Sequence, residues 1–216
     1  MISVENIEKS YNSEKVLKNA SLKIEDSEFV SIMGKSGSGK STLISIMGGF
    51  LAPDSGRVLY DGKDIFKYND SQLSSFRCTK IGFVFQAFGL IPTLNVMDNL
   101  LLPSTLGKSQ SKEQREYILE LCKALEIDTM LKKYPDELSG GQCQRVAIVR
   151  ALSYEPSVVI LDEPTGALDS AMEKKVMELL VKINKEKGTT IIQVTHSERV
   201  ASYGTRIIKI NDGEIA

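Results

Sequence analysis

The 216-residue sequence has no tryptophan, a single histidine and only three cysteines. The cysteines are odd in number and lack metal-ligand spacing, so neither a disulfide framework nor a zinc site is expected, and a reducing cytosol suits the chain. No apolar run approaches the roughly 18 residues that a membrane helix needs. The opening Met1–Glu5 lacks the basic and apolar regions of a signal peptide. Any membrane-spanning part is therefore expected on another chain.

An excess of charge of one sign is also absent. The 27 basic and 28 acidic residues leave a formal net charge of −1, so no electrostatic field favours nucleic acid as a partner. The sequence does contain 42% hydrophobic and 25% charged residues. At this length, that composition predicts a single domain with a substantial core.

Short strand-like runs separated by helix-like stretches predict an α/β fold with a largely parallel core sheet. Asp61-Gly62 and Asp212-Gly213, each between strand-like flanks, predict hairpin turns, so some antiparallel sheet is attached. The predicted strands are 21–25, 29–33, 80–85, 157–161, 189–194 and 206–210.

Two serine capping boxes predict helix starts near Ser111 and Ser170. The interval 87–155 lacks convincing strands, which predicts a helical insertion between two core strands. The core and the antiparallel part would then occupy about 1–86 and 156–216.

A glycine-rich loop from Gly34 to Thr42 follows the predicted strand 29–33 and precedes an apolar, helix-like run. This strand–loop–helix context is typical of a phosphate-binding loop, whose backbone amides curl around phosphates. We expect Lys40 to reach the β- and γ-phosphates and the Ser41 hydroxyl to ligate Mg²⁺. The loop predicts ATP and Mg²⁺ as ligands. The expected phosphate-binding residues are Gly34, Ser36, Gly37, Ser38, Gly39, Lys40, Ser41 and Thr42.

An apolar run over 158–161 ends in two carboxylates, Asp162 and Glu163. In isolation this ending is common surface chemistry, but behind a phosphate loop it favours a catalytic pair. Asp162 would hold Mg²⁺, and Glu163 would polarise a water molecule that attacks the γ-phosphate.

The pentapeptide Leu138-Ser139-Gly140-Gly141-Gln142 predicts a second, lysine-free anion site. Ser139 is expected to cap a helix, and Gln142 stands three residues on, as in a capping box. The paired glycines leave backbone N–H groups uncovered at the positive end of that helix, where a phosphate binds readily.

With this pentapeptide and the phosphate loop, essentially the whole chain closely resembles the ATP-binding subunit of ABC transporters. The resemblance implies a P-loop NTPase (RecA-like) core of mostly parallel sheet, an antiparallel β subdomain and an inserted helical subdomain. In that family the pentapeptide completes the nucleotide site of a second copy. Ser139, Gly140, Gly141 and Gln142 are therefore expected to bind the partner's ATP.

The resemblance also assigns residues whose patterns are ambiguous alone. A lone histidine is usually a satisfied surface or core residue, but His196 matches the family's switch histidine, which contacts the γ-phosphate. Gln86 matches the glutamine loop, which reaches Mg²⁺ and the attacking water. Asp169 matches the loop that crosses between subunits, and it could also cap a helix. Tyr11 lies where the family stacks an aromatic ring on adenine; the alternative is a solvent-facing tyrosine.

The catalytic residues that the resemblance implies are Lys40, Gln86, Glu163 and His196. The metal ligands that it implies are Ser41, Gln86 and Asp162.

Residues 83–94 and 162–170 look like the MacB/LolD branch of macrolide exporters, lipoprotein-release ATPases and antimicrobial-peptide resistance transporters. The branch implies an ATPase at the cytoplasmic face of the membrane, paired with a second copy or a related subunit and powering an integral membrane permease. The apolar segment 83–94 would present a docking patch to that permease. Cys143 departs from the family, which usually has glutamine there.

Three alternatives differ in class. The same ATPase could drive a non-transport membrane complex in cell-wall or division regulation, which the sequence does not separate from transport. A DNA-repair ATPase would carry coiled-coil or metal-binding insertions that this sequence lacks. A small-molecule kinase has no use for the pentapeptide. The transported substrate stays open.

Overall fold

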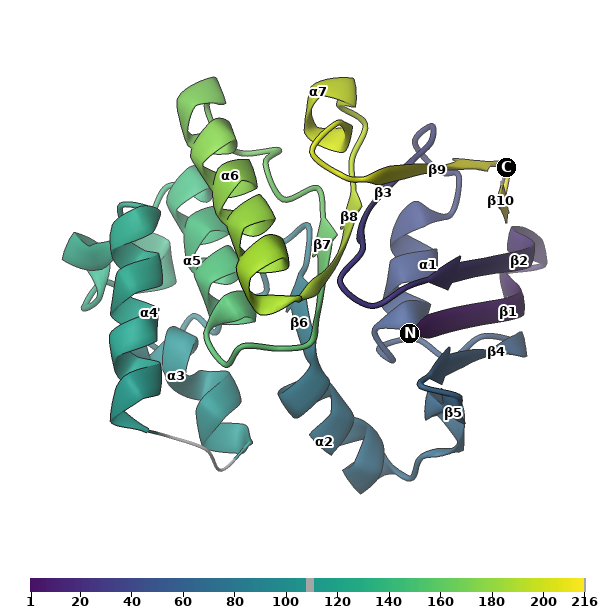
Figure 1. The fold of residues 1–216 in the computed structure, drawn as a ribbon, viewed down its shortest axis with the longest axis horizontal. Helices are drawn as coiled ribbons and strands as arrows, with labels where there is room; N and C mark the ends of the chain where they lie inside the picture. Colours follow the sequence, from purple (N-terminus) through teal and green to yellow (C-terminus); the bar gives the residue numbers. More distant parts are fainter. Residues whose placement is uncertain (108–110, 216) are drawn as a thin grey trace.

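Two β-sheets and the helices around them make up the computed structural model, which describes residues 1–107 and 111–215 (Figure 1). The strands are β1 (Ile2–Tyr11), β2 (Glu14–Ile24), β3 (Phe29–Met33), β4 (Ser55–Tyr60), β5 (Lys63–Asp64), β6 (Ile81–Val84), β7 (Val158–Asp162), β8 (Thr190–Val194), β9 (Arg206–Asn211) and β10 (Glu214–Ile215). The helices are α1 (Lys40–Met47), α2 (Asp70–Lys80), α3 (Val96–Leu106), α4 (Lys112–Ala124), α5 (Gly140–Leu152), α6 (Ser170–Lys187) and α7 (Glu198–Ala201), with 3-10 turns η1 (Ile65–Lys67), η2 (Asp128–Met130) and η3 (Pro135–Glu137).

The larger sheet has the strand order β10-β9-β3-β8-β7-β6, in which β9, β3, β8, β7 and β6 run parallel. Every residue of β6, β7 and β8 is buried, as expected for parallel strands covered on both faces. Parallel strands present their carboxyl ends at one edge of the sheet, where α/β proteins bind their ligands. The segments that leave β3, β6, β7 and β8 therefore meet at that edge.

The smaller sheet, β2-β1-β4-β5, is antiparallel throughout. Helix α1 lies between it and the larger sheet (Figure 1), and apolar residues of all three elements form one core cluster. The Lys18 N–H donates to the Gly213 carbonyl at 2.9 Å and ties β2 to the β9–β10 hairpin. Together the two sheets confirm the predicted α/β architecture with an attached antiparallel part.

Both predicted hairpins are present, with turn residues in the left-handed region that this tight turn requires. Asp61 and Gly62 have φ values of 49° and 76°, and Asp212 and Gly213 have values of 48° and 84°. A third two-residue turn joins β1 to β2 and was not predicted from the sequence.

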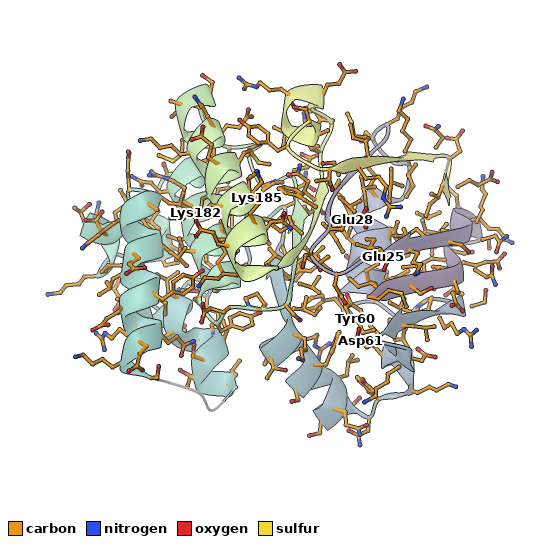
Figure 2. All side chains as sticks on the ribbon, in the orientation of Figure 1. Glu25, Glu28, Tyr60, Asp61, Lys182 and Lys185 are labelled. Atoms are coloured by element: carbon orange, nitrogen blue, oxygen red, sulfur yellow. The ribbon has the colours of Figure 1, made fainter. Side chains whose placement is uncertain are left out.

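Helices α3, α4 and α5 follow β6 in the chain and lie at the end of the molecule farthest from the smaller sheet (Figure 1). They share a second core cluster with α6, whose outer face carries exposed lysines such as Lys182 and Lys185 (Figure 2). The division into a core and an insertion over about 87–155 stays a prediction. None of the helices in the described ranges is long and apolar enough to cross a bilayer.

The two predicted helix starts differ in their caps. Ser111 caps α4 as predicted, accepting from the Gln114 N–H at 3.2 Å. Helix α6 begins at Ser170, but its cap is Asp169, whose Oδ1 accepts from the N–H groups of Ala171 and Met172. The predicted helix start near Ser170 and the alternative cap at Asp169 are therefore confirmed, whereas the capping box at Ser170 was wrong by one residue.

Candidate nucleotide site

A cavity of about 790 Å³ lies at the carboxyl edge of the larger sheet. It contains the predicted catalytic residues together with most of the glycine-rich loop. Glu14 and Val16 of β2 also line it, although no sequence motif marks them. The full lining is Tyr11, Glu14, Val16, Gly34, Ser36, Gly37, Gly39, Lys40, Ser41, Thr42, Gln86, Glu163 and His196.

The first turn of α1 is built to receive an anion. Its N-cap is Gly39 at φ 95°, so no side chain caps the first N–H groups, and no acidic residue occupies the first turn. Uncovered amides at the positive end of a helix attract phosphate. A Cβ atom on Gly39 would lie only 2.7 Å from the Val16 carbonyl oxygen. Both its backbone angle and this close approach therefore require glycine.

The Lys40 side chain is buried in the loop, and its ammonium donates to the carbonyls of Gly34 at 2.9 Å and Lys35 at 2.7 Å. A positive charge is thereby held at the wall of the cavity. The Ser38 hydroxyl is buried too, and no hydrogen-bond partner reaches it within the described part of the chain. The Lys40 ammonium and the unpaired Ser38 hydroxyl could therefore both bind an anionic ligand.

Asp162, the last residue of β7, is the buried carboxylate of the site. Burial raises its pKa, while a hydrogen bond from Ser41 and the charge of Lys40 act in the opposite direction. Among the described residues no donor reaches its Oδ1 atom.

An orphaned carboxylate oxygen beside a serine hydroxyl fits Mg²⁺, a hard cation that prefers oxygen ligands and keeps much of its water. No cluster of three or more His, Cys, Asp or Glu side chains within residues 1–107 and 111–215 could hold a metal alone. Magnesium bound here would therefore need ligands from water and from a bound phosphate.

Glu163 and His196 meet where β7 and β8 end. The Glu163 Oε1 atom lies 3.2 Å from His196 Nδ1, and the Glu163 N–H donates to the Val194 carbonyl at 3.0 Å. Glu163 has a φ of 51°, a left-handed conformation that costs a non-glycine residue about 1–3 kcal/mol and often marks functional sites.

The pentapeptide lies in a different place. Ser139 caps α5 and forms the predicted capping box with Gln142, at 3.3 Å and 2.8 Å for the two reciprocal hydrogen bonds. A second cavity of about 380 Å³ is lined by Glu126, Ser139, Gly141, Arg145, Ala167, Leu168, Asp169 and Met172. No residue lines both cavities. Within one chain the structure therefore brings Ser139 and Asp169 together but keeps both apart from Lys40.

Tyr11, the apolar segment 83–94 and Cys143 lie outside the phosphate loop and the pentapeptide. Tyr11 is 46% exposed at the rim of the first cavity, which leaves its adenine-stacking role a prediction. The apolar patch expected over 83–94 is not freely exposed, since Leu90, Ile91 and Leu94 are each half-buried. Cys143 is buried, and its thiol donates to the Pro135 carbonyl at 3.6 Å.

A family model described as ABC transporter matches residues 17–166. The chain belongs to the ABC transporter family. As an ATP-binding cassette of that family it is an ATPase.

Similar cassettes cover the whole chain. The uncharacterized ABC transporter ATP-binding protein MJ0796 of Methanocaldococcus jannaschii is 45% identical over 223 residues, which span 100% of this chain and 95% of MJ0796. The lipoprotein-releasing system ATP-binding protein LolD of Aquifex aeolicus is 44% identical over 218 residues, with 100% and 96% covered. The macrolide export ATP-binding/permease protein MacB of Campylobacter jejuni is 42% identical over 215 residues, which span 100% of this chain but 33% of MacB.

Two solved structures of MJ0796 have the same fold as this ABC cassette. A dimeric structure superposes with a TM-score of 0.95 at 44% identity, and it covers 100% of this chain and 96% of that one. A dimeric post-hydrolysis state bound to ADP and Pi superposes with a TM-score of 0.94 at 43% identity, with the same coverage.

Proposed function

We propose that this cassette powers a membrane complex as a pair of copies, with two ATP molecules held between them. The observation that carries the proposal is the separation of the two cavities on one chain. The phosphate loop lines one cavity, and the capped N-terminus of α5 lines the other. Each half offers part of an ATP site, and a second copy can supply the missing half.

In the first half, the α1 amides and Lys40 bind the phosphates, and Tyr11 stacks on the adenine. Asp162, Ser41 and Gln86 would hold Mg²⁺, which would supply positive charge to neutralise the phosphates. The remaining loop residues contribute amides and hydroxyls around the phosphates.

Glu163 acts as the general base on the attacking water. Its position at the end of β7 places a carboxylate at the cavity wall, and His196 at 3.2 Å orients it and contacts the γ-phosphate. Gln86 also contacts this water.

In the second half, the first turn of α5 binds the γ-phosphate of the opposite copy. Ser139, Gly140, Gly141 and Gln142 supply the amides and the hydroxyl, and Asp169 crosses the interface beside them. Closure of the pair then depends on ATP, because these contacts exist only in the closed state. The dimeric state of MJ0796 in its solved structures supports this arrangement.

A membrane permease is the proposed partner, bound at the cytoplasmic face of the membrane. MacB, which is similar to this chain over a third of its own length, is an ATP-binding/permease protein, and LolD belongs to a lipoprotein-releasing system. These relatives support export of a drug, peptide or lipoprotein. Co-purification from detergent-solubilised membranes identifies the partner and distinguishes transport from a non-transport complex.

Mixing two inactive variants tests whether the halves act across the pair. Lys40→Ala removes the phosphate cation. Ser139→Asp keeps a good N-cap for α5 while placing a negative charge against the opposite γ-phosphate. Gly141→Asp is a poorer choice, since a Cβ atom there would lie 2.8 Å from the Ala167 carbonyl oxygen.

Each variant alone should be inactive, whereas an equimolar mixture should recover roughly a quarter of the wild-type ATPase rate. About half of the dimers are mixed, and each of these has one intact composite site. The matched control mixes Lys40→Ala with the Lys40→Ala/Ser139→Asp double variant, which leaves no intact site. A mixture that co-purifies through a tag on one chain yet hydrolyses no ATP contradicts the proposal.

A further inference from the structure

Arg150, near the C-terminal end of α5, makes an unusual pair of contacts. Its guanidinium donates through Nη1 to the Gly89 carbonyl at 2.6 Å and through Nη2 to the Phe88 carbonyl at 2.9 Å. No described carboxylate lies within ion-pair distance of it, and burial lowers its pKa. Burial of a charge that has no counter-ion and only two backbone carbonyls as acceptors is unfavourable. We therefore expect Arg150 to have a specific role.

The two carbonyls belong to a strained turn directly after Gln86. Phe88 has a φ of 62° and Gly89 a φ of 61°, and a left-handed conformation is strained for phenylalanine though not for glycine. The Phe88 N–H closes the turn on the Phe85 carbonyl at 2.9 Å. Arg150 thus holds in place the turn that presents Gln86 to the nucleotide cavity.

The same turn also reaches the other end of α5. A Cβ atom on Gly140 would lie 3.9 Å from the Phe88 Cζ atom, so the ring packs against the first turn of the helix. Ten residues separate Gly140 from Arg150, about 15 Å of helix. Phe88 therefore contacts α5 at its N-terminus through the ring and near its C-terminus through its carbonyl.

We infer that Arg150 is a positioning residue that fixes the Gln86 turn to α5, so that the pentapeptide and Gln86 move as one body. This inference rests on the proposed role of Gln86 in the site. Contact of the pentapeptide with the partner's ATP would then set the position of Gln86 in this chain's own site. Arg150 lines neither cavity, so it would act only through the turn.

Arg145 provides a matched comparison on the same helix. Its guanidinium also donates to two backbone carbonyls of a loop, those of Leu125 at 2.7 Å and Glu126 at 3.1 Å, and in addition to the Gly141 carbonyl at 3.4 Å. Among the described residues it donates to neither Phe88 nor Gly89, so its loss should leave the link between Arg150 and the Gln86 turn intact.

A double-mutant cycle tests the inference in the full-length dimer with Mg-ATP. Arg150→Gln should lower kcat by about tenfold or more, the scale of losing hydrogen bonds from a charged donor. ATP affinity from equilibrium titration should stay within about twofold, because the phosphate loop is untouched. Arg150→Lys should recover part of kcat, since an ammonium can donate to one of the two carbonyls but lacks the paired donor groups of a guanidinium.

The deciding result is the effect of Arg150→Gln in a Gln86→Ala background. If Arg150 acts through Gln86, adding Arg150→Gln to the Gln86→Ala variant should lower kcat no further. Arg145→Gln should instead give the same proportional loss in both backgrounds. Independent, multiplicative losses for Arg150 and Gln86 overturn the inference and leave the proposed site intact. A full kcat for Gln86→Ala removes Gln86 from the proposed site and overturns the inference with it.

Discussion

The carboxylate of Glu163 and the imidazole of His196 lie 3.2 Å apart, although 33 residues separate them in the chain. The parallel pairing of β7 with β8, in which Asp162 stands opposite Val194, brings them together. The strand ends therefore fix the position of the proposed base, and no flexible loop has to close for the pair to form.

Replacement of Glu163 by Gln should leave ATP binding intact and slow hydrolysis by roughly 10²–10⁴-fold, because an amide cannot accept the proton of water. Steady-state phosphate release and equilibrium titration measure the two effects. Glu186→Gln, an exposed carboxylate on α6, is the control and should keep the wild-type rate. Wild-type turnover in Glu163→Gln would remove this residue from the proposed mechanism.

Lys40→Met should weaken ATP binding by roughly 10–100-fold, because the phosphates lose the ammonium that the loop holds at the cavity. Lys35→Met removes the same charge from the same loop but from an exposed side chain, and it should change affinity by about threefold at most. Calorimetric titration of both variants gives the comparison. Equal losses for the two lysines would mean that only the net charge of the loop matters.

Asp162→Asn should raise the melting temperature of the nucleotide-free protein at pH 7. The substitution removes a buried carboxylate whose pKa burial raises and whose Oδ1 lacks a described partner. The same variant should lose most of the stabilisation that Mg-ATP gives to wild type. Differential scanning fluorimetry with and without Mg-ATP measures both changes. A variant that melts lower in both conditions contradicts this account of Asp162.

The cysteines should differ in their reaction with iodoacetamide at pH 8. Burial raises the pKa of Cys122 to about 12, and since only the thiolate reacts, this thiol should stay unlabelled in the folded protein. Cys78 is half-buried and should label first. Because the folded state keeps the Cys122 proton that the unfolded state loses, this group should lower stability as pH rises from 9 towards 12. Peptide mass spectrometry and melting curves test these statements.

Most of the fold could be predicted from short stretches of the sequence. The buried strands β3, β7 and β8 are mostly apolar runs, and the Asp-Gly turns require left-handed residues, so both were predicted from short windows. Strand β1 was missed because its register shifts between Val4 and Ile7, where Asn6 has a φ of 51°, and this irregularity breaks the alternation of apolar and polar residues. The sequence left the cap of α6 open between Asp169 and Ser170, since both residues suit an N-cap.

The residues of the candidate site were predicted unevenly. The glycine-rich loop, Asp162 and Glu163 follow from motifs with a physical meaning, but Gln86 and His196 were found only through the family resemblance. Val16 and Arg150 escaped because their roles depend on contacts between distant segments. The guanidinium of Arg150 reaches carbonyls 61 and 62 residues away in the chain, and no local pattern encodes that contact.

The two separate cavities have a further consequence for how the cassette behaves when it is scarce. A site assembled from two chains makes turnover second order in protein at low abundance, so the rate per chain should fall as the sample is diluted. Isolated subunits would then hold ATP without consuming it. The proposed membrane partner would bring two copies together and raise their local concentration, so that ATP would be hydrolysed mainly where a complex has assembled.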